Sequence, residues 1–307
     1  MENTSDKLGV PQFKTVPLRH PFRYVAATIV VLLFTLLVFG AARNQALQWA
    51  AVGRYLFNDQ VLDGLLQTIL LTIAIMILAV VAGIVIALMN LSPSNLLSLP
   101  ARGFVWLFRG TPALVQLILW YNLALFVPEM TLSIPGVGTL FSVSSNDVMT
   151  PLLAAILALG LHEAGYMAEI IRSGIQSVGK GQTEAALCLG MKPSKLMWRI
   201  IMPQAMRVII PPTGNETINL LKTTSLVSTI AVDDLLYSAQ GIYSRTFETV
   251  PLLIVVTIWY LIVVSIMSVG QFYLERHFAR DQYAPRTKLS TVAFANIFRL
   301  RREVVAK

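Results

Sequence analysis

Cysteine and charge are both scarce in this sequence of 307 residues. Cys188 is the one cysteine, which excludes an internal disulfide and any metal site built from several cysteines. We expect it to be a small packing residue on a helix. Charged residues make up 13% of the chain, whereas soluble domains carry roughly a quarter. Composition therefore points away from a soluble globular domain.

Recognisable catalytic sets are missing as well. The pair His162-Glu163 has no second histidine four residues beyond the first, so it is not the zinc-binding helix of a metalloprotease. Segment 174–181 nearly spells a phosphate-binding loop, but Gly181 stands where that loop needs Ser or Thr. An apolar span also precedes the segment in place of a strand. We expect no catalytic residue, no metal, no cofactor and no nucleotide binding by this chain.

Apolar residues, in contrast, make up 55% of the chain and gather in long runs. About 20 such residues suffice to cross a bilayer. Six segments fit, namely 24–42, 65–89, about 99–127, 151–171, 208–236 and 251–273. The third contains Arg102 and Arg109, so its unbroken apolar part is 113–127 and its helix should begin upstream, at the membrane surface. The sequence predicts an all-α membrane protein with about six transmembrane helices.

Basic residues give the formal charge of +8, but they are sorted by loop rather than clustered for nucleic acid. Twenty of the 24 lysines and arginines lie in the amino-terminal tail, before the apolar part of the third span, in 172–207 and in the carboxyl-terminal tail. The intervening loops hold only Arg43, Arg54 and Arg245, and Lys222 lies within a span. The positive-inside rule places both termini and segment 172–207 in the cytoplasm.

Both ends of the chain leave alternatives. The first span is longer than the apolar region of a secretory signal, about 7–15 residues, so a retained anchor is expected, although small residues 40–42 also permit cleavage. Residues 279–307 are basic and carry a possible apolar stripe. This tail is either a helix on an anionic membrane surface or a solvated tail. The stripe consists of Val292, Ala293, Ile297, Leu300 and Val304.

Segment 182–203 is the most informative part of the chain. It follows the pattern Glu-Ala-Ala, three residues, Gly, nine residues, Ile, one residue, Leu-Pro, with Met202 in place of the Leu. The matching residues are Glu184, Ala185, Ala186, Gly190, Ile200 and Pro203. This pattern resembles the signature loop of bacterial ABC-transporter permeases, which docks onto an ATP-hydrolysing partner. The alternative is a solvated amphipathic loop.

The residue types in this loop also predict its local structure. A short helix can begin at Gln182 or Thr183 and end at Gly190 in the left-handed conformation, and Pro193 can open the next helix. We expect small Ala185 and Ala186 to approach a groove on the partner, with Glu184 at its rim.

Further segments resemble the polar amino-acid permeases within that family. They are 108–116, with its Arg-Gly-Thr-Pro sequence, 165–175 and 215–228. Where many relatives have Lys-Asp-Thr-Ser, this chain has Lys222-Thr223-Thr224-Ser225. The resemblance covers about 62–276. It implies a type I ABC importer permease fold, with 1–61 as a tail, extra span and external loop. It also implies a coupling loop at 180–207 and a basic tail at 277–307.

Glu216 and Lys222 are costly residues in the fifth span, since a charge at mid-membrane costs roughly 2.5–3.5 kcal/mol on insertion scales. Their six-residue offset is about 240° around a helix, so they are not natural neighbours. Either Lys222 reaches an interface, or the helix unwinds near residues 223–225. An unwound stretch with Ser225 could hold a zwitterion, Lys222 taking its carboxylate and Glu216 an amino or cationic group. The alternative is a structural pair with another helix.

The resemblance implies a multi-pass subunit of the bacterial inner membrane that imports polar amino acids. Implied partners are two ATP-binding subunits, a second permease subunit and an extracytoplasmic substrate-binding protein. Alternatives are a permease for another small solute and, in a different class, a channel or regulatory membrane protein. A channel would not need the docking loop.

Overall fold

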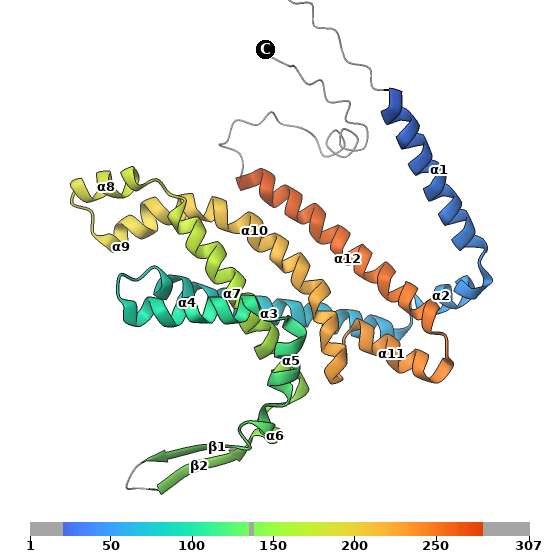
Figure 1. The fold of residues 1–307 in the computed structure, drawn as a ribbon, viewed down its shortest axis with the longest axis horizontal. Helices are drawn as coiled ribbons and strands as arrows, with labels where there is room; N and C mark the ends of the chain where they lie inside the picture. The colour runs from blue at the N-terminus through green and yellow to red at the C-terminus, as the bar shows by residue number, and fades with distance from the viewer. Residues whose placement is uncertain (1–20, 135–137, 279–307) are drawn as a thin grey trace, which may run out of the picture. The chain divides into compact units, whose positions relative to one another are not determined.

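The computed structural model describes residues 21–134 and 138–278 of the chain (Figure 1). The amino-terminal tail before residue 21 and the apolar stripe of the carboxyl-terminal tail lie outside these residues. Contacts divide the chain into two units, with helix α1 (Pro21–Arg43) in one and residues 45–278 in the other. The functional site is built entirely in the second unit.

The second unit is a chain of helices with one small sheet. Its longer elements are, in order, α2 (Trp49–Tyr55), α3 (Asp59–Asn90), α4 (Asn95–Gly110), α5 (Ala113–Tyr121), β1 (Glu129–Ile134), β2 (Gly138–Ser144), α7 (Pro151–Gln176), α8 (Lys180–Cys188), α10 (Met202–Thr223), α11 (Leu235–Thr246) and α12 (Thr249–Phe278). The short ones are η2 (Gln45–Leu47), η3 (Leu123–Leu125), α6 (Ser145–Val148), α9 (Pro193–Leu196), the π-helical turn η4 (Met197–Ile201) and the 3₁₀ helix η5 (Thr224–Ile230).

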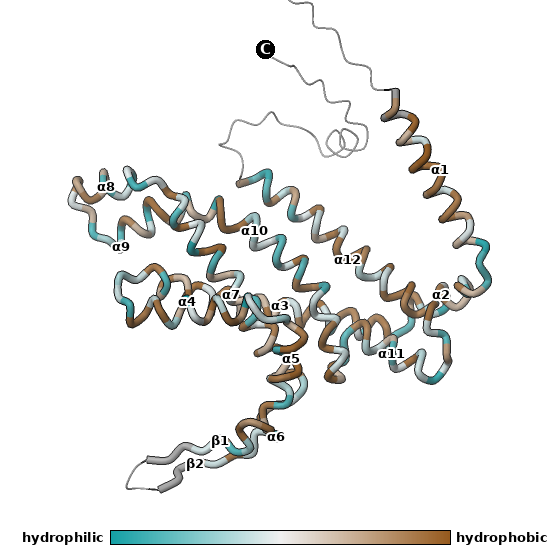
Figure 2. Tube along the Cα trace, in the orientation of Figure 1, coloured by the Kyte–Doolittle hydropathy of each residue, from teal (hydrophilic) through white to brown (hydrophobic). Residues whose placement is uncertain are grey.

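Four helices of the described chain are long and apolar enough to cross a membrane, namely α1, α3, α7 and α12. They coincide with the predicted spans 24–42, 65–89, 151–171 and 251–273, which are confirmed as helices. Figure 2 shows hydrophobic colour along α1 and α12, whereas α10 is interspersed with hydrophilic residues.

The predicted third span is a bent pair of helices rather than one continuous helix. It begins upstream, as expected, but α4 and α5 meet at an angle of 104°. The break falls at Thr111-Pro112, where Thr111 adopts extended dihedrals (φ −114°, ψ 145°). A proline ring disfavours the helical conformation for the residue before it, and Thr111 is extended here, so α4 ends at Gly110.

The predicted fifth span, 208–236, also needs correction. Helix α10 passes without a gap into the 3₁₀ helix η5, which ends at Ile230 because Ala231 adopts a left-handed φ of 60°. The chain therefore changes helix type at residues 223–224 instead of unwinding. Hydroxyl groups support this change, since Thr224 donates to the carbonyl of Leu221 at 2.7 Å and Ser225 to that of Lys222 at 2.7 Å. Such bonds to a preceding turn bend helices locally.

The β1–β2 hairpin was not predicted from the sequence and makes the fold not wholly α-helical. Its strands pair antiparallel, with an irregularity between Leu132 and Ser133. At its base the Ser145 hydroxyl donates to the carbonyl of Val127. Alternating apolar residues before Pro135-Gly136 are a strand signal that could have revealed it.

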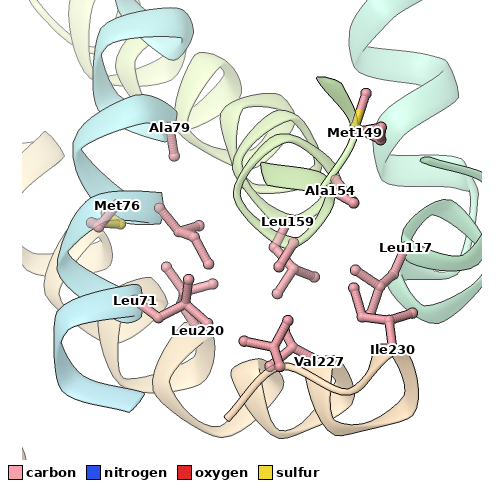
Figure 3. Packing of buried hydrophobic residues seen from close by; sticks show 14 of the residues in the cluster. Leu71, Met76, Ala79, Leu117, Met149, Ala154, Leu159, Leu220, Val227 and Ile230 are labelled. Atoms are coloured by element: carbon pink, nitrogen blue, oxygen red, sulfur yellow. The ribbon is translucent and has the colours of Figure 1, made fainter. Parts of the chain in front are cut away.

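Helix α3 contributes to all three buried apolar clusters of this unit. Its 32 residues span about 48 Å at 1.5 Å per residue. Three clusters of buried apolar side chains lie along it, represented on α3 by Val61, by Leu71 to Ala79, and by Ala87. The middle cluster is drawn in Figure 3, with α7 packed between α3, α5 and the α10–η5 segment. Its labelled members include Met76, Leu117, Leu159, Leu220 and Val227.

Glycines let the helices of this unit pack closely. A Cβ atom added at Gly83 of α3 would lie 2.6 Å from the Cβ of Met167 on α7, and one at Gly174 would overlap the side chain of Ile209 on α10. Small residues at such contacts are the usual means of close packing between membrane helices. Helix α7 is thereby held tightly against both α3 and α10.

Candidate functional site

The signature segment forms a short helix with a well-defined end. Helix α8 begins at Lys180, two residues before the predicted start at Gln182. Gly190 has a φ of 71°, as predicted, and its N–H donates to Leu187 at 2.9 Å, while the N–H of Met191 donates to Ala186 at 3.1 Å. These two bonds form the Schellman motif that ends helices at a left-handed residue.

Some side chains of α8 are exposed, and others pack against the rest of the chain. Glu184 and Ala185 are exposed, as a docking role requires. Ala186 is only 4% exposed and packs against the chain itself, so the prediction that it faces a partner is not supported by this geometry. Farther along the same segment, the large apolar side chains of Leu189 and Trp198 are 82% and 69% exposed. We call Glu184, Ala185, Leu189 and Trp198 the docking edge.

Pro203 marks the point where the signature segment joins α10. Helix α9 opens at Pro193, as predicted, and continues through η4 into α10 without a break. Within η4 the N–H of Met202 donates to Met197, one residue farther back than in an α-helix. Pro203 cannot donate to the carbonyl of Arg199, and the wider π turn accommodates the missing bond. The docking edge is therefore continuous with a long helix.

Helix α10 carries both charged residues that the sequence singled out. Glu216 is half-buried and Lys222 is exposed. No ion pair joins Glu216 to Lys222, whereas Arg172 pairs with Glu169 on α7. Helical dihedrals continue past Lys222, so the two side chains leave α10 on different sides. The structure thus brings Glu216 and Lys222 onto one helix without pairing them.

Ser225 lies directly after these residues, in η5. Its hydroxyl hydrogen is already donated to the carbonyl of Lys222. The oxygen retains lone pairs, so the side chain can still accept a hydrogen bond from a ligand such as an ammonium group. Thr224 is fully buried and anchors the same turn.

Glu163 on α7 is a residue that sequence reasoning missed as a site candidate. Its side chain is 6% exposed, its Oε1 has no hydrogen-bond partner, and it interacts electrostatically with Glu216 on α10. The available signal was its position inside an apolar span, where an ionisable residue is rarely placed without a function. In the sequence Glu163 stands out only as the neighbour of His162 in an incomplete metal-binding motif.

The bend between α4 and α5 is fastened to α7 by one amide. The Nε2 of Gln116 donates to the carbonyls of Phe108 and Thr111, at 2.9 and 3.2 Å, and lies 3.2 Å from Nδ1 of His162. Gln116 is 7% exposed. The Arg-Gly-Thr-Pro segment is thereby held against α7 at His162.

The near match to a phosphate-binding loop has a different structure. Gly174 lies inside α7, where it contacts Ile209, and Lys180 is the first residue of α8. The segment thus joins two helices, whereas a phosphate-binding loop joins a strand to a helix.

A cavity of about 800 Å³ opens at the other end of the unit from α8. It lies between the beginning of α3, the beginning of α7 and the link from η5 to α11. Its polar lining includes Gln60, Asp63, Gln67, Thr150, Asp233 and Ser238. Two carboxylates and no lysine or arginine give this cavity a negative character.

Comparison with known proteins fits this geometry. Residues 79–280 match the family described as "Binding-protein-dependent transport system inner membrane component". The arginine transport system permease protein ArgU of Corynebacterium glutamicum is 45% identical over 91% of this chain and 87% of its own length. The glutamate/aspartate import permease protein GltK of Escherichia coli is 34% identical over 71% of this chain and 93% of its own.

Solved structures agree in fold. A chain from the crystal structure of an amino acid ABC transporter with histidines is 33% identical, with a TM-score of 0.62 over 72% of this chain and 95% of that one. A chain of the MetNI methionine ABC transporter, at 17% identity and a TM-score of 0.57, shares the fold.

These matches confirm the type I ABC importer permease fold and the role of an ABC permease. Proteins of this family work with ATP-binding and substrate-binding components. The chain is a membrane-embedded transport protein and belongs to the binding-protein-dependent inner membrane components, as an amino-acid ABC transporter permease.

Proposed function

We propose that this chain imports polar amino acids across the inner membrane of a bacterium, with both termini and the docking edge in the cytoplasm. Two ATP-binding subunits bind the docking edges of two permease subunits, and an external binding protein delivers the substrate. Its relatives are named as permease proteins, which supports a chain that catalyses no reaction itself. Basic residues crowd the proposed cytoplasmic side, which supports the orientation.

One observation carries the proposal, namely that α10 connects the docking edge directly to Glu216 and Lys222. Its 22 residues run from Met202, next to Pro203, to Thr223, next to Lys222, over about 33 Å. Helix α7, which enters the same loop from the other side, carries Glu163. Movement of the loop is therefore transmitted to both carboxylates through helices rather than through flexible links.

Coupling begins at the docking edge. Closure of the ATP-binding subunits displaces Glu184 and Ala185, and the Gly190 turn together with Pro203 makes α8 to α10 move as one lever. The spans then alternate between outward and inward access. Hydrolysis itself belongs to the partner subunits.

Substrate recognition centres on the unpaired charges of α10. Lys222 binds the carboxylate of the amino acid, Glu216 binds its ammonium group, and Ser225 accepts a further hydrogen bond. An unpaired lysine directly before a change of helix type, and a carboxylate on the same helix, support this assignment, because ionisable residues within membrane-spanning segments usually serve a function. The acidic cavity near Asp63 and Asp233 would then be the outer entrance.

Uptake by the complete complex in proteoliposomes tests the assignment. Lys222→Ala is expected to abolish uptake of every amino acid that the wild-type complex accepts. Glu216→Gln should weaken uptake about 10- to 100-fold, the loss of one charged hydrogen bond. Arg54→Ala, which removes an exposed positive charge on α2, is the matched control and should transport normally.

The structural alternative predicts another pattern. If Glu216 and Lys222 serve assembly, each single variant leaves a lone charge and lowers complex yield, while the double variant restores it. Recovery of uptake in the double variant would refute the recognition role, since a site without either charge cannot hold a zwitterion.

A further inference from the structure

The acidic cavity of about 800 Å³ has walls that helix packing fixes. It lies between the beginnings of α3 and α7 and the link of residues 231–234 that joins η5 to α11. Gly64 of α3 lets α11 approach closely, because a Cβ atom at this position would overlap the Oγ of Ser238. The N–H of Leu235 also donates to Oγ1 of Thr68 on α3, at 2.9 Å. The cavity is therefore preformed, and little ordering is needed when a ligand binds.

Two carboxylates in the lining of this cavity have no cation beside them. Asp63 of α3 and Asp233 of the link are both exposed, and neither forms an ion pair within the described residues. Arg245 of α11 donates instead to the carbonyl of Gly241 at 2.8 Å and to Oε1 of Gln60 at 3.5 Å. The cavity thus presents negative charge that the described part of the chain does not neutralise.

Ser238 adds a buried hydroxyl group to the lining. The residue is 6% exposed, and its Oγ has no hydrogen-bond partner among the residues that the structure describes. A hydroxyl group shielded from bulk water is stabilised when a ligand completes its hydrogen bonds. Carboxylate and hydroxyl oxygens all accept hydrogen bonds, so the lining matches a cationic group with several N–H donors, namely an ammonium or a guanidinium.

The loops around the cavity are acidic as well. In the proposed orientation, the extracytoplasmic loops of the second unit hold seven acidic residues and two arginines. The acidic residues are Asp59, Asp63, Glu129, Asp147, Asp233, Asp234 and Glu248, and the arginines are Arg54 and Arg245. A protein that docks on this side is attracted when its contacting surface is basic.

We propose that Asp63 and Asp233 form a socket for a lysine or arginine side chain of the extracytoplasmic binding protein. This inference rests on the proposed function, in which that protein delivers the substrate to this side. A free amino acid is a poorer occupant, because the lining offers no lysine or arginine to its carboxylate. A dehydrated metal ion would occupy a small part of about 800 Å³, whereas a long basic side chain with part of its loop fills more of it.

Occupation of the socket acts on the segment that ends α10. Asp233 lies in the link that directly follows η5, and η5 continues α10 without a gap. A basic side chain held between Asp233 and Asp63 therefore ties the end of the α10–η5 segment to the beginning of α3. The docked binding protein thereby contacts, through the link, the helix that reaches the docking edge.

Titration of the binding protein tests the socket. The binding protein that supports uptake is added in increasing amounts to the complete complex in proteoliposomes, and the concentration for half-maximal uptake is measured. The double variant Asp63→Asn with Asp233→Asn should raise this concentration at least about 10-fold, the lower range for hydrogen bonds to charged groups. Added NaCl should weaken the wild-type complex more steeply than the double variant, because the attraction between charges is screened.

Three control variants isolate the charge of the socket. Asp63→Glu keeps the charge and should retain most of the affinity, whereas Asp233→Lys repels the incoming side chain and should weaken docking more than Asp233→Asn. Asp147→Asn removes an exposed carboxylate on the same side but outside the cavity lining, and should change the concentration less than about 2-fold. Equal weakening by Asp147→Asn, or an unchanged concentration in the double variant, would overturn the inference.

Other occupants of the cavity give different results. A bound divalent cation would make docking to the wild-type complex depend on added Ca²⁺ and be lost in EDTA, and a free substrate would make the double variant raise the half-maximal substrate concentration at saturating binding protein. Either result contradicts the socket. If the wild-type complex imports no amino acid at any concentration of binding protein, the proposed function fails instead, so the two failures are distinguishable.

Discussion

The turn at Gly190 provides the most direct test of coupling between the permease and its ATP-binding subunit. Its φ of 71° lies in the left-handed region, which non-glycine residues enter at a cost of about 1–2 kcal/mol. A Cβ atom at this position would meet nothing within 4 Å, so the cost of Gly190→Ala is conformational and not steric. One to two kcal/mol lowers the population of the ordered turn roughly 5- to 30-fold.

Different substitutions at Gly190 should therefore form a series. Asn tolerates positive φ and should retain most coupling, Ala should lose part of it, and β-branched Val should lose the most. Substrate-stimulated ATPase activity and uptake are measured on complexes reconstituted in proteoliposomes. Membrane insertion of the subunit, followed by its amount in the membrane fraction, should stay normal because the affected bonds lie only at the end of α8.

Gly181 offers a matched control for the same helix. It lies inside α8, and a Cβ atom there also meets nothing within 4 Å, but its backbone is helical. Gly181→Ala should be neutral or slightly stabilising, since alanine favours helix by up to about 1 kcal/mol over glycine. If Gly190→Val keeps wild-type substrate-stimulated ATPase activity, the coupling role of the turn is wrong.

Three further outcomes are expected. Gln116→Leu removes an amide that holds the α4–α5 bend and should lower the thermal unfolding midpoint of the purified subunit. The lost buried hydrogen bonds correspond to about 1–3 kcal/mol of stability. Gln204→Leu, at an exposed position, is the control and should leave the midpoint unchanged. Gly174→Val should reduce the yield of folded protein by separating α7 from α10, with Gly179→Ala as an unaffected control, and equal yields would contradict that contact. The purified subunit should show no saturable ATP binding; binding that Lys180→Ala abolishes would refute this.

Most of the membrane topology was readable from the sequence because long apolar runs have few alternative structures. Helices α3, α7 and α12 were placed to within six residues at each end. Prediction was weaker where local geometry interrupts a run. Pro112 carried the signal for the α4–α5 break, but the 104° angle depends on tertiary contacts such as that of Gln116 with His162. The β1–β2 hairpin was not predicted, because long apolar runs locate the spans but give no information on the loops between them.

The candidate site was predicted in part. Gly190 could be assigned a left-handed conformation because few other roles suit a glycine after a short helix, and its φ confirms this. Ala186 was assigned to the surface by its small size, but side-chain direction around α8 turns it inward. Glu163 could not be related to Glu216, because they are 53 positions apart and meet only through the packing of α7 on α10.

The hydroxyl side chains after Lys222 have a consequence for the mobility of this part of the chain. Thr224, Ser225, Ser228 and Thr229 each donate to the carbonyl three residues earlier, at 2.7 or 2.8 Å. A helix that bends in lipid normally strands carbonyl oxygens, and each costs several kcal/mol unless water or a neighbour reaches it. The carbonyls of Leu221, Lys222, Ser225 and Leu226 thus each have a second donor within their own turn. The segment can therefore bend locally without leaving these four carbonyls unpaired.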